Sequence, residues 1–362
     1  MPTRHLEVEA AMDTMVVETD RIRTHCFVAG PEDGVPMLLL HGNLTTGRFW
    51  QGVADGMPDG YRVVAPDLRG FGRTERKPID ATRGLRDWSD DVHALVEALG
   101  WAGGGRVHAA GWSTGGGVLQ QYAIDHGEEL ASLCLVAPLS PYGFGGTRDV
   151  DGTPCYDDYA GSGAGTAAPD FVRRVAAGDD SEDEPTSSPR VVMRSFFWSP
   201  AYKAPDEDEL MAEVLLTAVG DTAYPGDLAT SPNWPGVAPG TAGVNNAFAP
   251  KWCDTSGFAE VANKVPVLWL RGDTDQVVSD ESMFDFGTLG KLGAVPGWPG
   301  LEVFPPQPHV GQMRAVLDRY RTGGAQVTEV VMEDCGHGPP VERAAEVRDR
   351  LLAHVEGAKP AG

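Results

Sequence analysis

The stretch that decides the fold is residues 107–117, which read VHAAGWSTGGG. A short apolar run ends in Gly111, Ser113 follows two residues later, and Gly115–Gly117 open a segment with helical character. Gly-x-Ser-x-Gly at a strand-to-helix junction is the sequence form of a nucleophile elbow, a strained turn that lifts the serine hydroxyl above the end of a sheet. Glycine is expected at 111 and 115 because a Cβ at either position would crowd the neighbouring strand and helix. The five-residue pattern alone occurs by chance in many chains, so its weight depends on the surrounding sequence.

Around this stretch, short apolar runs alternate with helical patterns, which is typical of a mostly parallel sheet flanked by helices. Apolar residues recur at three- and four-residue steps between 85 and 99, which predicts an amphipathic helix, and a last helix is expected at about 341–355. The chain is predicted to open with a hairpin and to form about eight central strands in all. These are expected at 14–18, 21–29, 37–40, 61–65, 106–110, 133–137, 265–270 and 327–332.

Two regions interrupt the alternation. Residues 138–262 show no clear sheet strand and are rich in Gly, Pro, Asp and aromatic residues, and 283–311 form a second Gly/Pro-rich stretch. Strands of the same sheet resume after each, so we interpret both as insertions rather than domain linkers. Helical patterns inside the first insertion cover 169–177, 187–198 and 206–219, and its acidic run 179–184 is interpreted as a solvated loop.

Composition restricts the partners of the protein. The 29 basic and 52 acidic side chains give a net charge of −23, which disfavours nucleic acid and anionic membranes as partners. Five cysteines without a C-x-x-C pair indicate reduced thiols and a cytoplasmic setting. The opening residues MPTRHLEVE contain no apolar core, so no signal peptide is expected, and no apolar stretch is long enough to span a membrane. A homodimer is compatible with these features.

Four stretches together resemble the α/β-hydrolase fold family, in the serine-nucleophile branch with a large cap inserted after the sixth strand. They are His41-Gly42-Asn43, the run DLRGFG at 67–72, the stretch around Ser113, and GDTD at 272–275 with Gly336-His337 further on. They occur in the order that the family shows. The resemblance implies a core of residues 1–137 and 263–362 and a helical cap of residues 138–262.

A catalytic triad is predicted from this arrangement. A serine hydroxyl is a poor nucleophile at neutral pH and needs an adjacent base, for which His337 follows the final strand in a loop. The imidazole in turn needs a carboxylate, and the family places its acid where Asp275 lies. Asp273 is the alternative acid, and Asp334 is close enough in sequence to reach His337, although a loop-shaping role is favoured for it.

The oxyanion hole is expected to use two backbone N–H groups. One belongs to Thr114 at the N-terminus of a helix, and the other to Asn43, with Leu44 as the alternative donor. The Asn43 side chain is interpreted either as a substrate contact or as part of the turn. The motif implies a structural role for His41, and structural roles are also expected for Asp67 and Arg69.

The nucleophile separates branches of the family. The His-Gly-Asn opening is similar to that of haloalkane dehalogenases, and the RGFG run is shared with epoxide hydrolases, but both use an aspartate where this chain has Ser113. A serine esterase or lactonase acting on an apolar or aromatic small molecule is therefore favoured. A perhydrolase, a hydroxynitrile lyase and a ligand sensor that retains the triad are the alternatives.

No cofactor and no metal are expected. Cys134 and Cys335 are interpreted as inert packing residues, and an acidic group that could suggest calcium is interpreted as a solvated loop (Asp149, Asp151, Asp157 and Asp158). The insertion is expected to roof the site with aromatic side chains. The predicted substrate-binding residues are Leu44, Trp112, Tyr142, Phe144 and Trp198.

Overall fold

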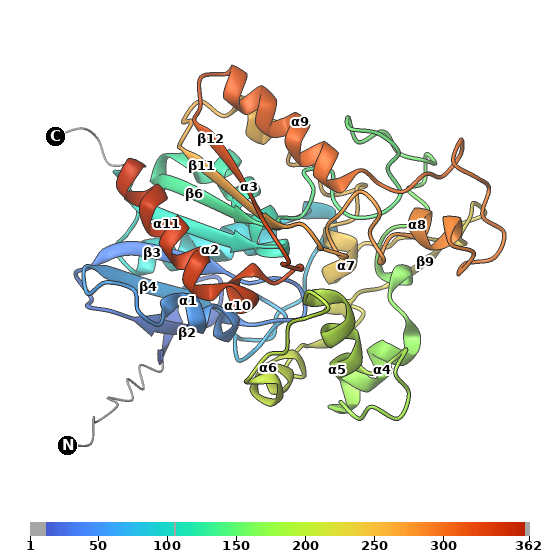
Figure 1. Ribbon diagram of the computed structural model, residues 1–362, viewed down its shortest axis with the longest axis horizontal. Coiled ribbons are helices and arrows are strands. Elements are labelled where there is room, and N and C mark those ends of the chain that lie inside the picture. The colour runs from blue at the N-terminus through green and yellow to red at the C-terminus, as the bar shows by residue number, and fades with distance from the viewer. Residues whose placement is uncertain (1–11, 105, 359–362) are drawn as a thin grey trace.

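An eight-stranded sheet lies at the centre of the molecule (Figure 1). The computed structural model describes residues 12–104 and 106–358, so the opening stretch in which no signal peptide is predicted lies outside the described residues. β2 is antiparallel to both of its neighbours, and the other pairings are parallel. The strands across the sheet are β1 (Asp13–Glu18), β2 (Arg23–Ala29), β4 (Tyr61–Pro66), β3 (Val35–Leu40), β5 (Val107–Trp112), β6 (Leu130–Val136), β11 (Val267–Gly272) and β12 (Val327–Met332).

The central strands form because their sequences are apolar without interruption. β5 and β6 are buried along almost their whole length, as strands covered by helices on both faces must be. β1 and β12 lie at the two edges and keep exposed residues. The predicted opening hairpin and the six further strands are confirmed, with boundaries that differ by at most three residues.

Helices cover both faces of the sheet. α2 (Arg86–Ala98) packs on α3 (Thr114–His126), and α1 (Gln51–Ala54) packs on α11 (Ala344–Ala358). The connection from β3 to β4 and the one from β4 to β5 run in opposite directions across the sheet, and right-handed crossovers therefore place α1 and α2 on opposite faces. α9 (His309–Thr322) packs on η6 (Ser256–Glu260), which also contacts α3. None of the helices in the described part of the chain is long and apolar enough to span a membrane.

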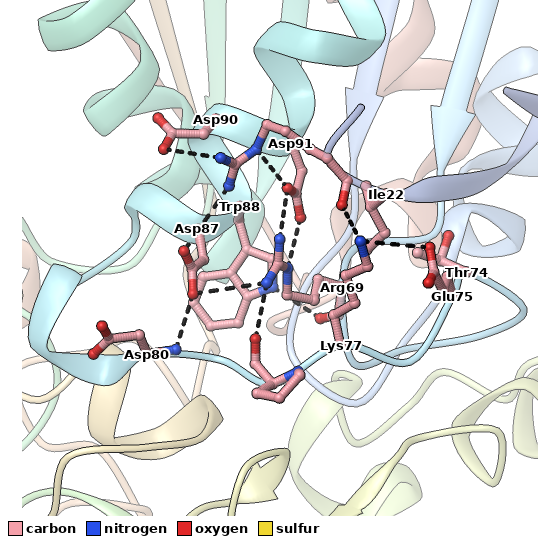
Figure 2. Close-up of polar contacts among 12 residues, drawn as sticks. Ile22, Arg69, Thr74, Glu75, Lys77, Asp80, Asp87, Trp88, Asp90 and Asp91 are labelled. Atoms are coloured by element: carbon pink, nitrogen blue, oxygen red, sulfur yellow. Dashed lines mark hydrogen bonds and ion pairs between the residues drawn. The ribbon is translucent and has the colours of Figure 1, made fainter. Parts of the chain in front are cut away.

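A buried network of ion pairs fixes the turn after β4 to α2 (Figure 2). Arg69 donates to both carboxylate oxygens of Asp91, at 2.7 and 2.8 Å, and Arg21 donates to the same carboxylate at 2.9 Å. The indole N–H of Trp88 donates to the Arg69 carbonyl at 2.9 Å. Asp67 also acts structurally, since its carboxylate accepts from the backbone N–H of Gly47 at 3.0 Å and of Arg73 at 2.9 Å. Both residues thus have the structural roles expected of them.

The segment between β6 and β11, called the insertion below, leaves the sheet and returns to it at the neighbouring position. Its helices α4, α5 and α6 lie together at one end of the molecule (Figure 1). It also contains two small two-stranded sheets that the sequence pattern did not predict, because strands of two or three residues are set by their partners. The longer elements of the insertion are α4 (Pro169–Ala177), α5 (Pro189–Val192), the π-helical turn Met193–Phe197, α6 (Glu207–Val214) and α7 (Val244–Ala247), and its strands are β7 (Val219–Gly220), β8 (Tyr224–Pro225), β9 (Leu228–Thr230) and β10 (Val237–Pro239).

The remaining short helices occupy connections. α8 (Phe286–Lys291) lies in the second predicted insertion and α10 (Pro339–Glu342) precedes α11. Single 3-10 turns are η1 (Gly47–Trp50), η2 (Ala81–Arg83), η3 (Gly127–Glu129) and η4 (Ala164–Thr166).

The acidic run of the insertion is a loop, but arginine side chains bind it. Arg174 is buried and pairs with Asp179 and Asp183 at 3.0 and 2.6 Å. Arg194 pairs with Glu182 at 3.0 Å, and Arg190 pairs with Asp180. The predicted solvated loop is confirmed, and arginines on α4, on α5 and on the π-helical turn reach back over it to pair with its carboxylates.

Candidate active site

Ser113 lies at the sharp turn between β5 and α3. Its backbone has φ 55° and ψ −118°, a strained conformation for a residue other than glycine. A Cβ on Gly111 would lie 2.4 Å from the carbonyl oxygen of Gly115, and a Cβ on Gly115 would lie 2.4 Å from that of Leu40. The predicted need for glycine at both positions is confirmed, because the strand, the turn and the helix touch there through backbone atoms.

His337 follows β12 and pairs with Asp275, which follows β11. The His337 Nδ1 lies 2.9 Å from one carboxylate oxygen of Asp275, and both side chains are almost completely buried. The other oxygen accepts from the backbone N–H groups of Val277 and Val278 at 2.7 and 2.9 Å. The carboxylate is thus held from two sides, which orients the ring and leaves Nε2 for the substrate side.

The alternative acids have other partners. The Asp273 carboxylate accepts from the backbone N–H of Cys335 at 3.3 Å and so shapes the loop that precedes His337. Asp334 has a positive φ of 50° and its carbonyl accepts from Arg343 at 3.1 Å. The geometry therefore favours Asp275 over both as the partner of His337.

Trp112 connects the serine turn to the histidine loop. Its indole N–H donates to the His337 carbonyl at 2.6 Å, and the two rings lie 5.7 Å apart. Ser113 and His337 line the same cavity, so two segments distant in sequence converge at one site. Ser113 is also fixed to the sheet, because its N–H donates to the Val136 carbonyl at 2.9 Å.

The predicted oxyanion donors also face this cavity. Asn43 and Thr114 both line it, and neither backbone N–H donates to a protein acceptor within residues 12–104 and 106–358. The turn that presents Asn43 is held by His41, whose Nε2 accepts from the Leu68 N–H at 2.9 Å while Nδ1 donates to the Gly42 carbonyl at 2.8 Å. Burial lowers the pKa of His41, so the ring is neutral and serves as a structural hydrogen-bonding group, as the motif implies.

The Asn43 side chain does not shape the turn. Its Oδ1 is buried and has no hydrogen-bond partner among the described residues. Of the two interpretations of Asn43, a contact with a bound molecule is favoured over turn geometry. Leu44 has a positive φ of 59° and also lines the cavity.

The cavity has a volume of about 400 Å³ and a mostly apolar wall. Leu44, Trp112 and Phe144 line it, as predicted for substrate-binding residues. Tyr142 and Trp198 are absent from its described lining, which corrects the expectation for both. The Tyr142 ring packs directly over Gly152, and the fully buried Trp198 ring packs over Gly338 behind the His337 loop.

Several wall residues were not predicted individually from the sequence. Phe171 and Met193 belong to the insertion, whereas Phe284, Phe286 and Leu289 belong to the second insertion around α8. Phe196 and Phe284 meet edge to face at 5.3 Å, so both insertions contribute to one wall. The only available signal was the aromatic content of each insertion, which does not say which rings face inward.

The cysteines and the acidic residues around Asp149 have structural roles. All five cysteines are free, and burial raises the pKa of Cys134 and Cys335 well above the usual range of a thiol. Asp149 accepts from the N–H groups of Asp151 and Thr153, which fits a loop-shaping role. No group of three or more His, Cys, Asp or Glu in the described ranges is arranged to hold a metal ion.

Comparison with known proteins identifies similar sequences. A model of the "Alpha/beta hydrolase family" matches residues 37–350. The chain is 30% identical to a fluoroacetate dehalogenase of a Burkholderia species over 130 residues, or 35% of this chain and 41% of that protein. It is 32% identical to lipase 3 of a Moraxella species over 119 residues, or 33% of this chain and 36% of that protein. The matched part thus spans less than half the length of these relatives.

Solved structures resemble most of the chain. A putative aryl esterase from Burkholderia cenocepacia aligns with a TM-score of 0.59 and 19% identity, covering 96% of this chain and 99% of that one. The carboxylesterase CesB from Bacillus subtilis aligns with a TM-score of 0.60 and 14% identity, covering 96% and 93%. At these identities the likeness establishes a shared fold.

Proposed function

The chain belongs to the alpha/beta hydrolase family, and from this premise we propose that it is a serine hydrolase that cleaves a carboxylic ester or lactone. The observation that carries the proposal is the convergence of Ser113, on its strained turn, and the His337–Asp275 pair at one cavity. The serine argues against dehalogenase and epoxide hydrolase chemistry, for which an aspartate is expected at this position.

In the proposed reaction, the Ser113 hydroxyl attacks the ester carbonyl while His337 Nε2 accepts its proton. The negative charge that develops on the carbonyl oxygen is stabilised by the N–H groups of Thr114 and Asn43, and the N-terminus of α3 favours that charge further. His337 then protonates the leaving alcohol. Asp275 holds the Nδ1–H and stabilises the imidazolium. A water molecule, deprotonated by the same histidine, attacks the acyl-enzyme, and the histidine returns this proton to the Ser113 oxygen as the acid is released.

An apolar acyl or aryl group is the proposed substrate class. The wall consists mainly of aliphatic and aromatic side chains, and the insertion acts as a cap that shields them from solvent. The described lining contains no lysine or arginine, and the net charge of −23 disfavours an anionic substrate.

Hydrolysis of p-nitrophenyl acyl esters tests the proposal. Wild-type protein is expected to release nitrophenol, and Ser113→Ala is expected to lose this activity by at least a thousandfold while its thermal unfolding stays close to that of the wild type. A fluorophosphonate label should map to Ser113. Full activity in Ser113→Ala, or a label on another residue, would refute the proposal.

A further inference from the structure

Four polar side chains of the cavity wall come from the insertion and take no part in the proposed reaction, namely Thr166, Thr186, Tyr224 and Asn245. Tyr224 lies in β8 and Asn245 in α7, and both line the cavity. The two elements lie side by side, because the Val244 N–H donates to the Ala223 carbonyl at 2.8 Å. The residues that follow, Asn245 and Tyr224, therefore stand on adjacent stretches of backbone and face the same space.

Asn245 lacks the hydrogen bonds that a buried amide needs. It is only 9% exposed, and its Oδ1 has no partner among the described residues. The next residue, Asn246, shows the contrast: its Oδ1 accepts from Ala164 and Gly240, and its amide nitrogen donates to Asp227 and Ala242. Asn246 thus stabilises the insertion, whereas Asn245 Oδ1 makes no hydrogen bond to the part of the chain that the structure describes.

Tyr224 offers a second polar group to the cavity, its hydroxyl. The residue is 5% exposed, its ring meets Phe171 edge to face at 6.5 Å, and its hydroxyl has no hydrogen-bond partner within residues 12–104 and 106–358. Burial alone raises the pKa of Tyr224, so the hydroxyl stays protonated and able to donate. Thr166, another polar residue of the wall, differs because its hydroxyl already donates to the Gly163 carbonyl at 2.8 Å.

Buried polar groups in proteins are normally paired, and unpaired ones at a cavity wall point to a ligand that pairs them. We propose that Tyr224 and Asn245 form a polar subsite that recognises a hydroxyl group on the substrate and so determines specificity. The Tyr224 hydroxyl donates a hydrogen bond to the oxygen of that group, and Asn245 Oδ1 accepts a hydrogen bond from its O–H. This inference rests on the proposed function, since it concerns the same cavity, but it makes a separate prediction about substrate choice.

The test compares p-nitrophenyl alkanoates with counterparts that carry a terminal hydroxyl, at chain lengths from four to ten carbons. At the length that reaches the subsite, kcat/KM is expected to favour the hydroxylated ester about tenfold or more, because a site built to bond a hydroxyl discriminates against an analogue without one. Tyr224→Phe and Asn245→Leu should each remove most of this preference, measured as the ratio of kcat/KM for the hydroxylated and unsubstituted esters in the same variant. Tyr61→Phe is the matched control, since Tyr61 is a buried tyrosine of β4 that does not line the described cavity wall.

A binding measurement separates the two proposals. In Ser113→Ala, calorimetry with methyl alkanoates and their terminally hydroxylated counterparts should show about tenfold tighter binding of one hydroxylated ester, lost on adding Tyr224→Phe. If Asn245→Leu fails to fold, Asn245→Thr and Tyr224→Phe carry the test. The subsite would be overturned if hydroxylated and plain esters were bound and hydrolysed equally at every chain length. It would also be overturned if the variants kept the preference unchanged. Hydrolysis that survives Ser113→Ala would instead refute the serine mechanism, and the binding preference would still decide on the subsite.

Discussion

At the scale of single residues, the candidate site combines one strained position with one doubly held carboxylate. The conformation of Ser113 costs about 1–3 kcal/mol in general, and backbone bonds to Val136 and Leu139 at 2.9 Å hold it in place. Asp275 divides its two oxygens between the His337 ring and two backbone N–H groups. Ser113 and Asp275 are therefore each held in position by residues outside their own strand.

The division of roles between the two carboxylates can be tested directly. Asp275→Asn is expected to lower kcat about 10³- to 10⁴-fold, because an amide at this position favours the wrong tautomer of His337. Asp273→Asn is the matched control, since the Asp273 carboxylate bonds the backbone N–H of Cys335 in the loop before His337, and it should lower kcat less than tenfold. Steady-state hydrolysis of a p-nitrophenyl ester measures both. Equal losses in the two variants would contradict the assignment of Asp275.

His309 predicts a pH dependence of stability. It is fully buried against Phe144, and burial lowers its pKa to about 3. The unfolded chain takes up this proton below about pH 6.5, while the folded protein does not. The contribution of neutral His309 to the free energy of unfolding is thus fully present above pH 6.5 and is lost as the pH falls toward 3. Between pH 7 and pH 5 the loss is about 2 kcal/mol.

The comparison of wild type with His309→Phe isolates this contribution. Urea unfolding at pH 7 and at pH 5 should show a larger loss of unfolding free energy in the wild type than in the variant, by about 2 kcal/mol. Burial raises the pKa of Asp285 to about 6, so this group raises the free energy of unfolding as the pH falls from about 6 to 4, opposite to His309. Asp285 is present in both proteins, so its effect cancels in the comparison. Equal losses in the two proteins would show that His309 does not titrate in this way.

At the scale of elements, the close approach of β3, β5 and α3 builds the turn that carries Ser113. The glycines at 111 and 115 permit this approach, and the ion pairs of Arg69 with Asp91 fix α2 beside it. The position of the nucleophile is therefore a property of packed backbone segments.

Two glycine variants test the packing of α3. Gly115→Ala is expected to destabilise the protein by more than about 2 kcal/mol, because its Cβ would lie 2.4 Å from the Leu40 carbonyl oxygen and backbone would have to shift. Gly127→Ala, just after the same helix, is the control: its Cβ would meet nothing within 4 Å, and its φ of −59° suits alanine. This variant should be neutral or stabilised by up to about 1 kcal/mol. Thermal and urea unfolding compare the two, and similar stabilities would contradict the proposed contact.

At the scale of the whole molecule, charge is the dominant feature. The net charge of −23 disfavours the folded state through self-repulsion, although arginines such as Arg174 bind part of the acidic surface. Which effect dominates can be read from the dependence of stability on salt.

Raising the NaCl concentration from about 10 mM to 0.5 M at pH 7 is expected to raise the Tm by several degrees, because the screening length falls well below the spacing of most surface charges. Choline chloride at the same ionic strength is the control and should have the same effect if screening is responsible. A Tm that falls with both salts would show that the arginine ion pairs outweigh the net repulsion.

Much of the core could be predicted from the sequence. Uninterrupted apolar runs identify buried parallel strands, and the glycines around Ser113 identify a tight turn, because both depend on short-range sterics and local periodicity. The order of Ser113, Asp275 and His337 along the chain also indicated one site. Whether these residues catalyse a reaction, and where the cap begins and ends, stay predictions.

Only the tertiary structure decided what surrounds that site. It pairs His337 with Asp275 rather than Asp273, excludes Tyr142 and Trp198 from the cavity wall, and brings Tyr224 and Asn245 to it. The physical reason is that the direction of an irregular loop and the partner of each polar group depend on contacts between segments far apart in the chain. A local pattern can thus predict a strand or a turn, whereas the wall of a cavity formed by two insertions is determined only when both have packed.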